Sequence, residues 1–229
     1  MSASDSQAER RRVVVNEVDV DCFSVVLPGT LAVPEGARAA VIFAHGSGSS
    51  RLSPRNLQVA GVLHESGLGT LLFDLLTDKE DQVYDNRFDI DLLAERLMGA
   101  TEWLRTQPGA EDFEVGYFGA STGAAAALQA SARLPEVKAV VSRGGRPDLA
   151  WDYLERVTAP TLLIVGGRDT EVIQLNRKAY ERLKLRRGTK RMVLVPGATY
   201  LFEEEGTLDR AAAEAARWFA KFLAGPRPT

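Results

Sequence analysis

Residues 115–123 read Val-Gly-Tyr-Phe-Gly-Ala-Ser-Thr-Gly, and four alanines follow at positions 124–127. The apolar half predicts a buried strand, the small residues predict the start of a helix, and a sharp G-x-S-x-G turn joins the two. Such a turn forces its central residue, Ser121, into a strained backbone conformation around which only very small residues fit. Gly119 and Gly123 stand two positions before and after it. The stretch therefore predicts a nucleophile elbow, and the alternative is a tight strand–helix turn without chemistry.

The composition fits an ordinary soluble chain with one α/β domain. Its 229 residues are 45% hydrophobic and 26% charged, and the formal net charge is −3. This balance gives no positive surface for nucleic acid, and we expect the one basic cluster, residues 184–191, to solvate a helix end and a loop. Cys22 is the single cysteine, which excludes an internal disulfide and a multi-cysteine metal site.

No apolar run approaches the length of a membrane span, and the first residues are too polar for a signal peptide. A phosphate-cradling G-K-[S/T] loop is also missing from the sequence. We therefore expect a cytoplasmic protein that uses no cofactor and no metal, and that binds neither a membrane nor nucleic acid.

Strands and helices alternate from residue 39 onward, which predicts an α/β fold with a mostly parallel sheet and helices on both faces. Before them, residues 13–20, 23–27 and 30–33 predict an antiparallel meander that turns at Pro28-Gly29. The expected strands then span residues 39–44, 70–75, 113–118, 138–142, 161–165 and 191–195, and the expected helices span residues 54–65, 89–106, 122–134, 148–156, 172–185 and 208–223.

No repeat or linker divides the chain, so we expect a single domain over residues 12–224. Residues 1–11 are expected to be a flexible N-terminus, and residues 225–229 a short tail. The longest irregular connection, residues 76–87, is acidic and is expected to be a solvated loop, with a segment that overhangs the site as the alternative. No insertion is long enough for a large lid.

A glycine-rich loop, His45-Gly46-Ser47-Gly48, follows the strand expected at 39–44, at the sheet edge where open α/β sheets place their sites. The third glycine of a dinucleotide fingerprint is absent from it. Backbone N–H groups near Gly46 and Ser47 could instead join the N–H of Thr122 in an oxyanion hole. In such a loop His45 is more often a structural residue than a chemical one.

Two further loops follow later strands. Asp169 comes after the strand at 161–165 and fits the acid in a Ser…Asp…His order, although it could also cap the helix at 172–185. Tyr200 comes after the last strand, where the third member of a triad is expected. The only histidines are His45 and His64, and His64 falls on the helix at 54–65 as a surface or packing residue. We expect Ser121, Asp169 and Tyr200 to converge in one cleft.

From about residue 12 to 224 the chain resembles an α/β-hydrolase of the dienelactone hydrolase type. Five motifs carry the resemblance: His45-Gly46-Ser47-Gly48-Ser49, Gly119-Ala120-Ser121-Thr122-Gly123, Ser142-Arg143-Gly144-Gly145-Arg146-Pro147-Asp148, Gly166-Gly167-Arg168-Asp169 and Pro196-Gly197-Ala198-Thr199. The chain is most similar to a small bacterial group that is often fused or adjacent to phosphoribosyltransferase domains.

This resemblance implies the α/β-hydrolase fold, with Ser121 as the nucleophile, Asp169 as the acid and a histidine at position 200 as the base. It also implies oxyanion N–H groups from Thr122 and the Ser47 region. As partners it implies a small ester or lactone substrate and a functional association with a phosphoribosyltransferase.

The chain departs from this family in two places. Dienelactone hydrolases proper carry a cysteine nucleophile, whereas Ser121 is closer to esterases. Tyr200 stands where the base histidine is implied. A phenol is neutral at pH 7, because its ordinary pKa is about 10, and cannot accept the serine proton without a cationic neighbour.

Three hypotheses follow. The first is an esterase-like serine hydrolase of small acyl esters or lactones, with a weakened base at Tyr200 and His45 as a possible substitute. The second is a catalytically inactive binding protein that keeps the pocket. The third is a His→Tyr variant of an active hydrolase.

Overall fold

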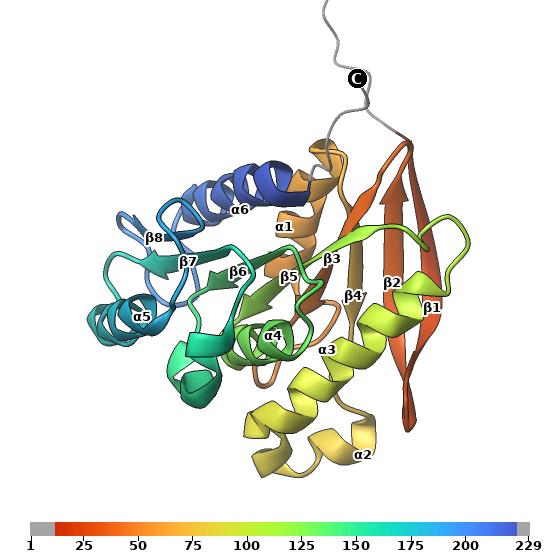
Figure 1. Ribbon diagram of the computed structural model, residues 1–229, viewed down its shortest axis with the longest axis horizontal. Coiled ribbons are helices and arrows are strands. Elements are labelled where there is room, and N and C mark those ends of the chain that lie inside the picture. Colours follow the sequence, from red (N-terminus) through yellow and green to blue (C-terminus); the bar gives the residue numbers. More distant parts are fainter. Residues whose placement is uncertain (1–11, 224–229) are drawn as a thin grey trace, which may run out of the picture.

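The computed structural model describes residues 12–223, which form one sheet with helices around it (Figure 1). The expected flexible start at 1–11 and tail at 225–229 lie outside the described residues. The strands are β1 (Val13–Cys22), β2 (Val25–Pro34), β3 (Ala39–Ala44), β4 (Gly69–Phe73), β5 (Glu114–Ala120), β6 (Ala139–Arg143), β7 (Thr161–Gly166) and β8 (Lys190–Val195). The helices are α1 (Pro54–Glu65), α2 (Asp78–Asp81), α3 (Ile90–Arg105), α4 (Thr122–Arg133), α5 (Thr170–Arg182) and α6 (Thr207–Leu223), with 3₁₀ helices η1 (Tyr84–Phe88) and η2 (Pro147–Arg156).

The strand order is β1-β2-β4-β3-β5-β6-β7-β8. The pairs β1–β2 and β2–β4 are antiparallel, and the remaining pairs are parallel. The predicted fold class, a mostly parallel sheet with an antiparallel start, is therefore confirmed. Because the parallel strands run in the same direction, the loops after β3, β5, β6, β7 and β8 meet at one edge of the sheet.

Helices cover both faces of the sheet, as predicted. In Figure 1, α1 and α6 lie on one face, and α3, α4 and α5 lie on the other. Successive residues of β3 alternate between the two layers: Val41 and Phe43 pack with α1 and α6, while Ala40 and Ile42 pack toward α3 and α4. Every residue of β3 is buried, which explains its uninterrupted apolar sequence.

The N-terminal meander differs from the prediction. Its turn lies at Phe23-Ser24, where Phe23 has φ 63°, and Pro28-Gly29 lies inside the continuous strand β2. The Pro28 carbonyl accepts the Asp74 N–H just past the end of β4. Since the N–H and C=O of one strand residue point to the same side, the missing proline N–H faces a place where the ladder has already ended. A Cβ on Gly29 would lie 2.9 Å from Val20, so close packing rather than a turn requires this glycine.

The segment 76–87 is not the irregular loop that was expected, because α2 and η1 occupy most of it, although residues 77–87 are exposed or partly exposed, as predicted. Thr77 and Glu80 form a reciprocal capping box at the start of α2, and Arg87 forms an ion pair with Asp81 at 2.7 Å. The segment expected as a helix at 148–156 is the 3₁₀ helix η2, with a kink at Ala150. Within residues 12–223, no helix combines the length and the apolar character that crossing a membrane requires.

Candidate active site

Ser121 stands at the sharp turn between β5 and α4. Its backbone has φ 54° and ψ −124°, a conformation that non-glycine residues rarely adopt and that costs free energy. Backbone hydrogen bonds hold the strained residue on three sides: its N–H donates to the Arg143 carbonyl, and its carbonyl accepts the N–H groups of Ala124 and Arg146. The turn thus has the geometry of a nucleophile elbow, with the side chain raised above the sheet edge.

The glycines around Ser121 are sterically required. A Cβ on Gly119 would lie 2.5 Å from the Ala124 Cα, and a Cβ on Gly123 would lie 2.1 Å from the Ala44 carbonyl oxygen. A Cβ on Gly46 would lie 2.9 Å from the Ser121 Cβ. The first turn of α4 therefore packs directly on β5 and on the end of β3.

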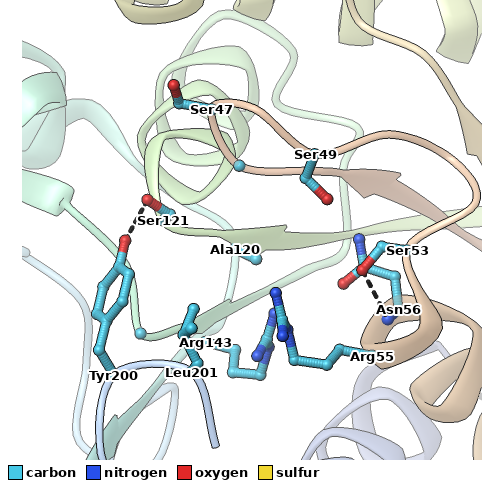
Figure 2. Close-up of a pocket in the computed structure, with 12 residues that line it drawn as sticks. Ser47, Ser49, Ser53, Arg55, Asn56, Ala120, Ser121, Arg143, Tyr200 and Leu201 are labelled. Atoms are coloured by element: carbon cyan, nitrogen blue, oxygen red, sulfur yellow. Dashed lines mark hydrogen bonds between the residues drawn. The ribbon is translucent and has the colours of Figure 1, made fainter.

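Tyr200 points at Ser121, as expected from its position after β8. Its hydroxyl donates a hydrogen bond to the Ser121 Oγ (Figure 2). The loop that carries Tyr200 comes close because neighbouring strand ends lack side chains. A Cβ on Gly166 would lie 2.5 Å from the Thr199 carbonyl oxygen, and one on Gly144 would lie 3.1 Å from the Tyr200 carbonyl oxygen.

Asp169 lies between the end of β7 and the start of α5 and is not part of a hydrogen-bonded chain with Ser121 and Tyr200. Its Oδ1 accepts the Val172 N–H at 3.2 Å, so it caps α5, which is the alternative role considered from the sequence. Within residues 12–223, no hydrogen bond joins Asp169 to Tyr200 or Ser121. A phenol has a single hydroxyl, which Ser121 already uses, whereas an imidazole offers a second nitrogen to an acid.

The two expected oxyanion donors differ in their availability. The Ser47 N–H donates to the Thr122 Oγ1 at 2.9 Å, which joins the glycine-rich loop to the elbow. Thr122 is the first residue of α4, and in the described part of the chain its own N–H has no hydrogen-bond partner. Thr122 therefore offers a free donor at a helix N-terminus, while the Ser47 N–H is occupied.

Both ring nitrogens of His45 are used within the fold. Its Nδ1 is 3.0 Å from the Gly46 carbonyl oxygen, and its Nε2 accepts the Leu75 N–H at 3.0 Å. Burial lowers the pKa of His45 from its ordinary value, which agrees with a neutral ring that donates at Nδ1. These contacts support a structural role rather than that of a substitute base. The second histidine, His64, has its Nε2 2.7 Å from the Thr70 Oγ1, a contact that joins α1 to β4 and agrees with a packing role.

The cavity beside Ser121 contains a charge that the sequence analysis did not single out. The cavity has a volume of about 130 Å³, and Arg143, Arg55 and Tyr200 are among its lining residues. Arg143 ends β6 and is only 6% exposed. Burial, with a smaller contribution from the neighbouring Arg55, lowers its pKa to about 10, although Tyr200 acts in the opposite direction. A charged residue directly after the apolar strand at 138–142 was the available signal.

No group of three or more histidine, cysteine, aspartate or glutamate side chains within residues 12–223 is arranged to hold a metal ion. The polar groups that reach the cavity are hydroxyl, amide and guanidinium groups. These groups bind oxygen-rich organic or anionic ligands better than they bind metal ions.

The strand order, the crossing helices and the strained serine together define an α/β-hydrolase. A crystal structure of dienelactone hydrolase from Anabaena variabilis has the same fold, with a TM-score of 0.87 and 53% sequence identity, over 92% of this chain and 99% of that one. An esterase from Butyrivibrio proteoclasticus shares the fold alone, with a TM-score of 0.75 at 15% identity over 91% of this chain and 99% of that one.

The profile of the dienelactone hydrolase family matches residues 66–224, and the chain belongs to this family. A protein of Mycobacterium tuberculosis with the provisional name phosphoribosyl transferase is 56% identical over 214 residues. That match covers 93% of this chain but 48% of the relative, so the chain spans about half the length of the curated relatives it matches.

The close approach at the elbow predicts a large effect of Gly123→Val on stability. The added side chain would meet the Ala44 carbonyl, so we expect the free energy of unfolding to fall by about 1–3 kcal/mol or more. Gly61→Ala is the matched control, because nothing lies within 4 Å of a Cβ on this exposed helical glycine, and it should stabilise by about 0.5–1 kcal/mol. Chemical denaturation measures both, and equal stability of Gly123→Val and the parent would contradict the close packing.

The two partly buried histidines predict that stability falls in mild acid. Burial lowers the pKa of both His45 and His64 below the unfolded value of about 6.5, so the unfolded chain takes up protons first as the pH falls. The contribution of each is complete above about pH 6.5 and is lost progressively below it. Between about pH 7.5 and about pH 5.5, the free energy of unfolding, measured by chemical denaturation, should therefore fall less for His45→Gln than for the parent. An unchanged slope in this variant would argue against the structural role of His45.

Proposed function

We propose that this chain is an esterase-like serine hydrolase that acts on small acyl esters or lactones through Ser121. One observation carries the proposal: a non-glycine residue held at positive φ, at the mouth of a cavity, where a hydroxyl can meet a substrate carbonyl. Membership of the dienelactone hydrolase family supports hydrolysis as the reaction class.

In this mechanism the Ser121 oxygen attacks the carbonyl carbon, the alcohol leaves, and water later releases the acid from the acyl-serine. The attack places negative charge on the former carbonyl oxygen. We propose that the free N–H of Thr122, at the N-terminal end of α4, stabilises that charge.

Removal of the serine proton is the step for which Tyr200 is poorly suited. The Tyr200 hydroxyl donates a hydrogen bond to the Ser121 oxygen, and a hydroxyl that donates to the nucleophile is not accepting the nucleophile's proton. Loss of the base from a serine triad costs up to ~10⁶ in kcat, while the oxyanion donors and substrate binding retain ~10³–10⁴ over water. We therefore propose weak esterase activity for this chain.

Changing Tyr200 tests this proposal. We expect the parent to hydrolyse a nitrophenyl ester weakly, Ser121→Ala to remove that activity, and Tyr200→His to raise kcat by at least ~10²-fold because imidazole is a competent base. Tyr200→Phe is the matched control, since it removes the hydrogen bond to Ser121 without supplying a base, and it should give no such gain. A fluorophosphonate probe reports separately on whether Ser121 is nucleophilic.

The inactive binding protein is the second candidate, and the hydrogen bond from Tyr200 to Ser121 favours it. If Tyr200→His gains nothing and Ser121 does not react with the probe, this candidate replaces the hydrolase. A large gain with Tyr200→His would instead support a chain whose only catalytic defect is the residue at position 200.

We also propose that the chain works together with a phosphoribosyl transferase. The name of the Mycobacterium tuberculosis relatives and the half of their length that this chain does not cover support this association. Co-expression of this chain with the uncovered half of the relative, followed by size-exclusion chromatography, tests it. Co-elution is expected, and separate elution of the two parts at micromolar concentration would contradict the association.

A further inference from the structure

The cavity beside Ser121 holds a buried cation without a counter-ion. The Arg143 guanidinium forms no hydrogen bond or ion pair with any residue in 12–223, and its Nε is fully buried without a partner. It lies over the Phe202 ring, 5.6 Å from the ring centroid. Arg96, the other buried arginine within residues 12–223, forms an ion pair with Glu80 at 2.7 Å. Buried charges are normally paired in this way, so an unpaired one at a cavity wall indicates a missing anionic partner.

A second cation lies in the same cavity. Arg55 extends from the first turn of α1, its guanidinium end overlaps that of Arg143 in the view of Figure 2, and its charge contributes to lowering the pKa of Arg143. Its one carboxylate partner is Glu203 at 3.2 Å, whose side chain is 64% exposed and lies outside the cavity lining. The Arg55 side chain is 34% exposed, whereas Arg143 is buried. A like charge beside a buried cation is unfavourable unless an anion lies between the two.

The N-terminus of α1 borders the same space. Ser53 caps this helix, its first turn contains no acidic residue, and Ser49, Ser53 and Asn56 are part of the cavity lining. The helix dipole favours an anion at such an end, and in the described part of the chain the Arg55 N–H has no hydrogen-bond partner. The buried Asn56 Oδ1 also has no partner, so the cavity offers an acceptor beside its many donors. A phosphate can satisfy both kinds of group, because it carries several acceptor oxygens and, near neutral pH, a P–OH donor.

We propose that this cavity binds the phosphoryl group of a phosphate-bearing ester between Arg143, Arg55 and the N-terminus of α1, with the ester carbonyl at Ser121. The identity of the reacting bond rests on the proposed esterase function. The backbone places the anion and the nucleophile side by side, because the Ser121 N–H donates to the Arg143 carbonyl. One guanidinium suffices for a planar carboxylate, whereas two guanidinium groups with hydroxyls around them suit a tetrahedral anion. Hydrolysis would break the acyl–oxygen bond, with water supplying OH to the acid and H to the phosphate-bearing alcohol.

Inorganic phosphate is the probe for the anion site, by calorimetric titration and by thermal melting against sodium chloride of equal ionic strength. We expect saturable binding that Arg143→Met and Arg55→Met weaken by about 10- to 100-fold, the usual scale for a charge-assisted hydrogen bond. Arg105→Met is the matched control, because Arg105 pairs with Glu136 away from the cavity, and it should bind phosphate like the parent.

A second readout separates a ligand site from a structural role of Arg143. Without phosphate, Arg143→Met should melt at or above the temperature of the parent, because it removes an unpaired buried charge. A lower melting temperature together with unchanged phosphate binding would overturn the proposal. So would equal effects of phosphate and chloride, or tighter binding of acetate than of phosphate.

A hydrolysis assay tests the preference for a phosphate-bearing ester. It compares 2-acetoxyethyl phosphate with its unphosphorylated analogue, 2-hydroxyethyl acetate. We expect a higher kcat/KM for the phosphorylated ester, and Arg143→Met should remove this preference. If phosphate binds through Arg143 but neither ester is hydrolysed and Ser121 does not react with a fluorophosphonate, the hydrolase proposal fails and the anion site stands. If both esters are hydrolysed equally, the anion site fails as a specificity determinant and the hydrolase stands.

Discussion

The close contact between the first turn of α4 and the ends of β3 and β5 is the constraint on which the site depends. With no side chain at Gly119 or Gly123, the helix backbone comes directly against the Ala44 carbonyl, and the turn before it must be sharp. Ser121 makes the sharp turn possible by adopting a positive φ, and hydrogen bonds from the N–H groups of Ala124 and Arg146 to its carbonyl hold this conformation. The same contact brings the glycine-rich loop against the elbow, where the Ser47 N–H bonds to the Thr122 hydroxyl.

The residue at position 200 changes what its neighbours can do. A histidine offers two nitrogens and can link a serine to an acid, whereas the phenol of Tyr200 has one hydroxyl and uses it on Ser121. Asp169 then keeps only its bond to the Val172 N–H, as a helix cap. Ser121, Asp169 and Tyr200 all follow strand ends at one edge of the sheet, but within residues 12–223 no hydrogen bond joins Asp169 to the other two.

Local patterns predicted the parts of the structure that depend on local rules. The apolar sequence of β3 predicted a strand of a parallel sheet, because a strand that is buried on both faces needs apolar residues throughout. The glycines around Ser121 predicted the elbow, because a crowded turn admits no side chain at those positions. Pro28-Gly29 misled because its role depends on where β4 ends, which only the assembled sheet decides. Arg143 was named only as part of a family motif, and its role was not predicted. Its missing partner is a property of the cavity, whose lining combines β6 and α1, with Arg143 and Arg55 88 positions apart in the sequence.

The cations of the cavity bear on the choice of base. A phenol can serve as a base only as a phenolate, which carries a negative charge. Tyr200, Arg143 and Arg55 line the same cavity, so an anionic group of the substrate between the two arginines would place a second negative charge near the ring. Anion binding and activation by a phenolate therefore oppose each other in this cavity. A base that is neutral before it accepts the proton and cationic afterwards, such as an imidazole, would be favoured by the bound anion instead.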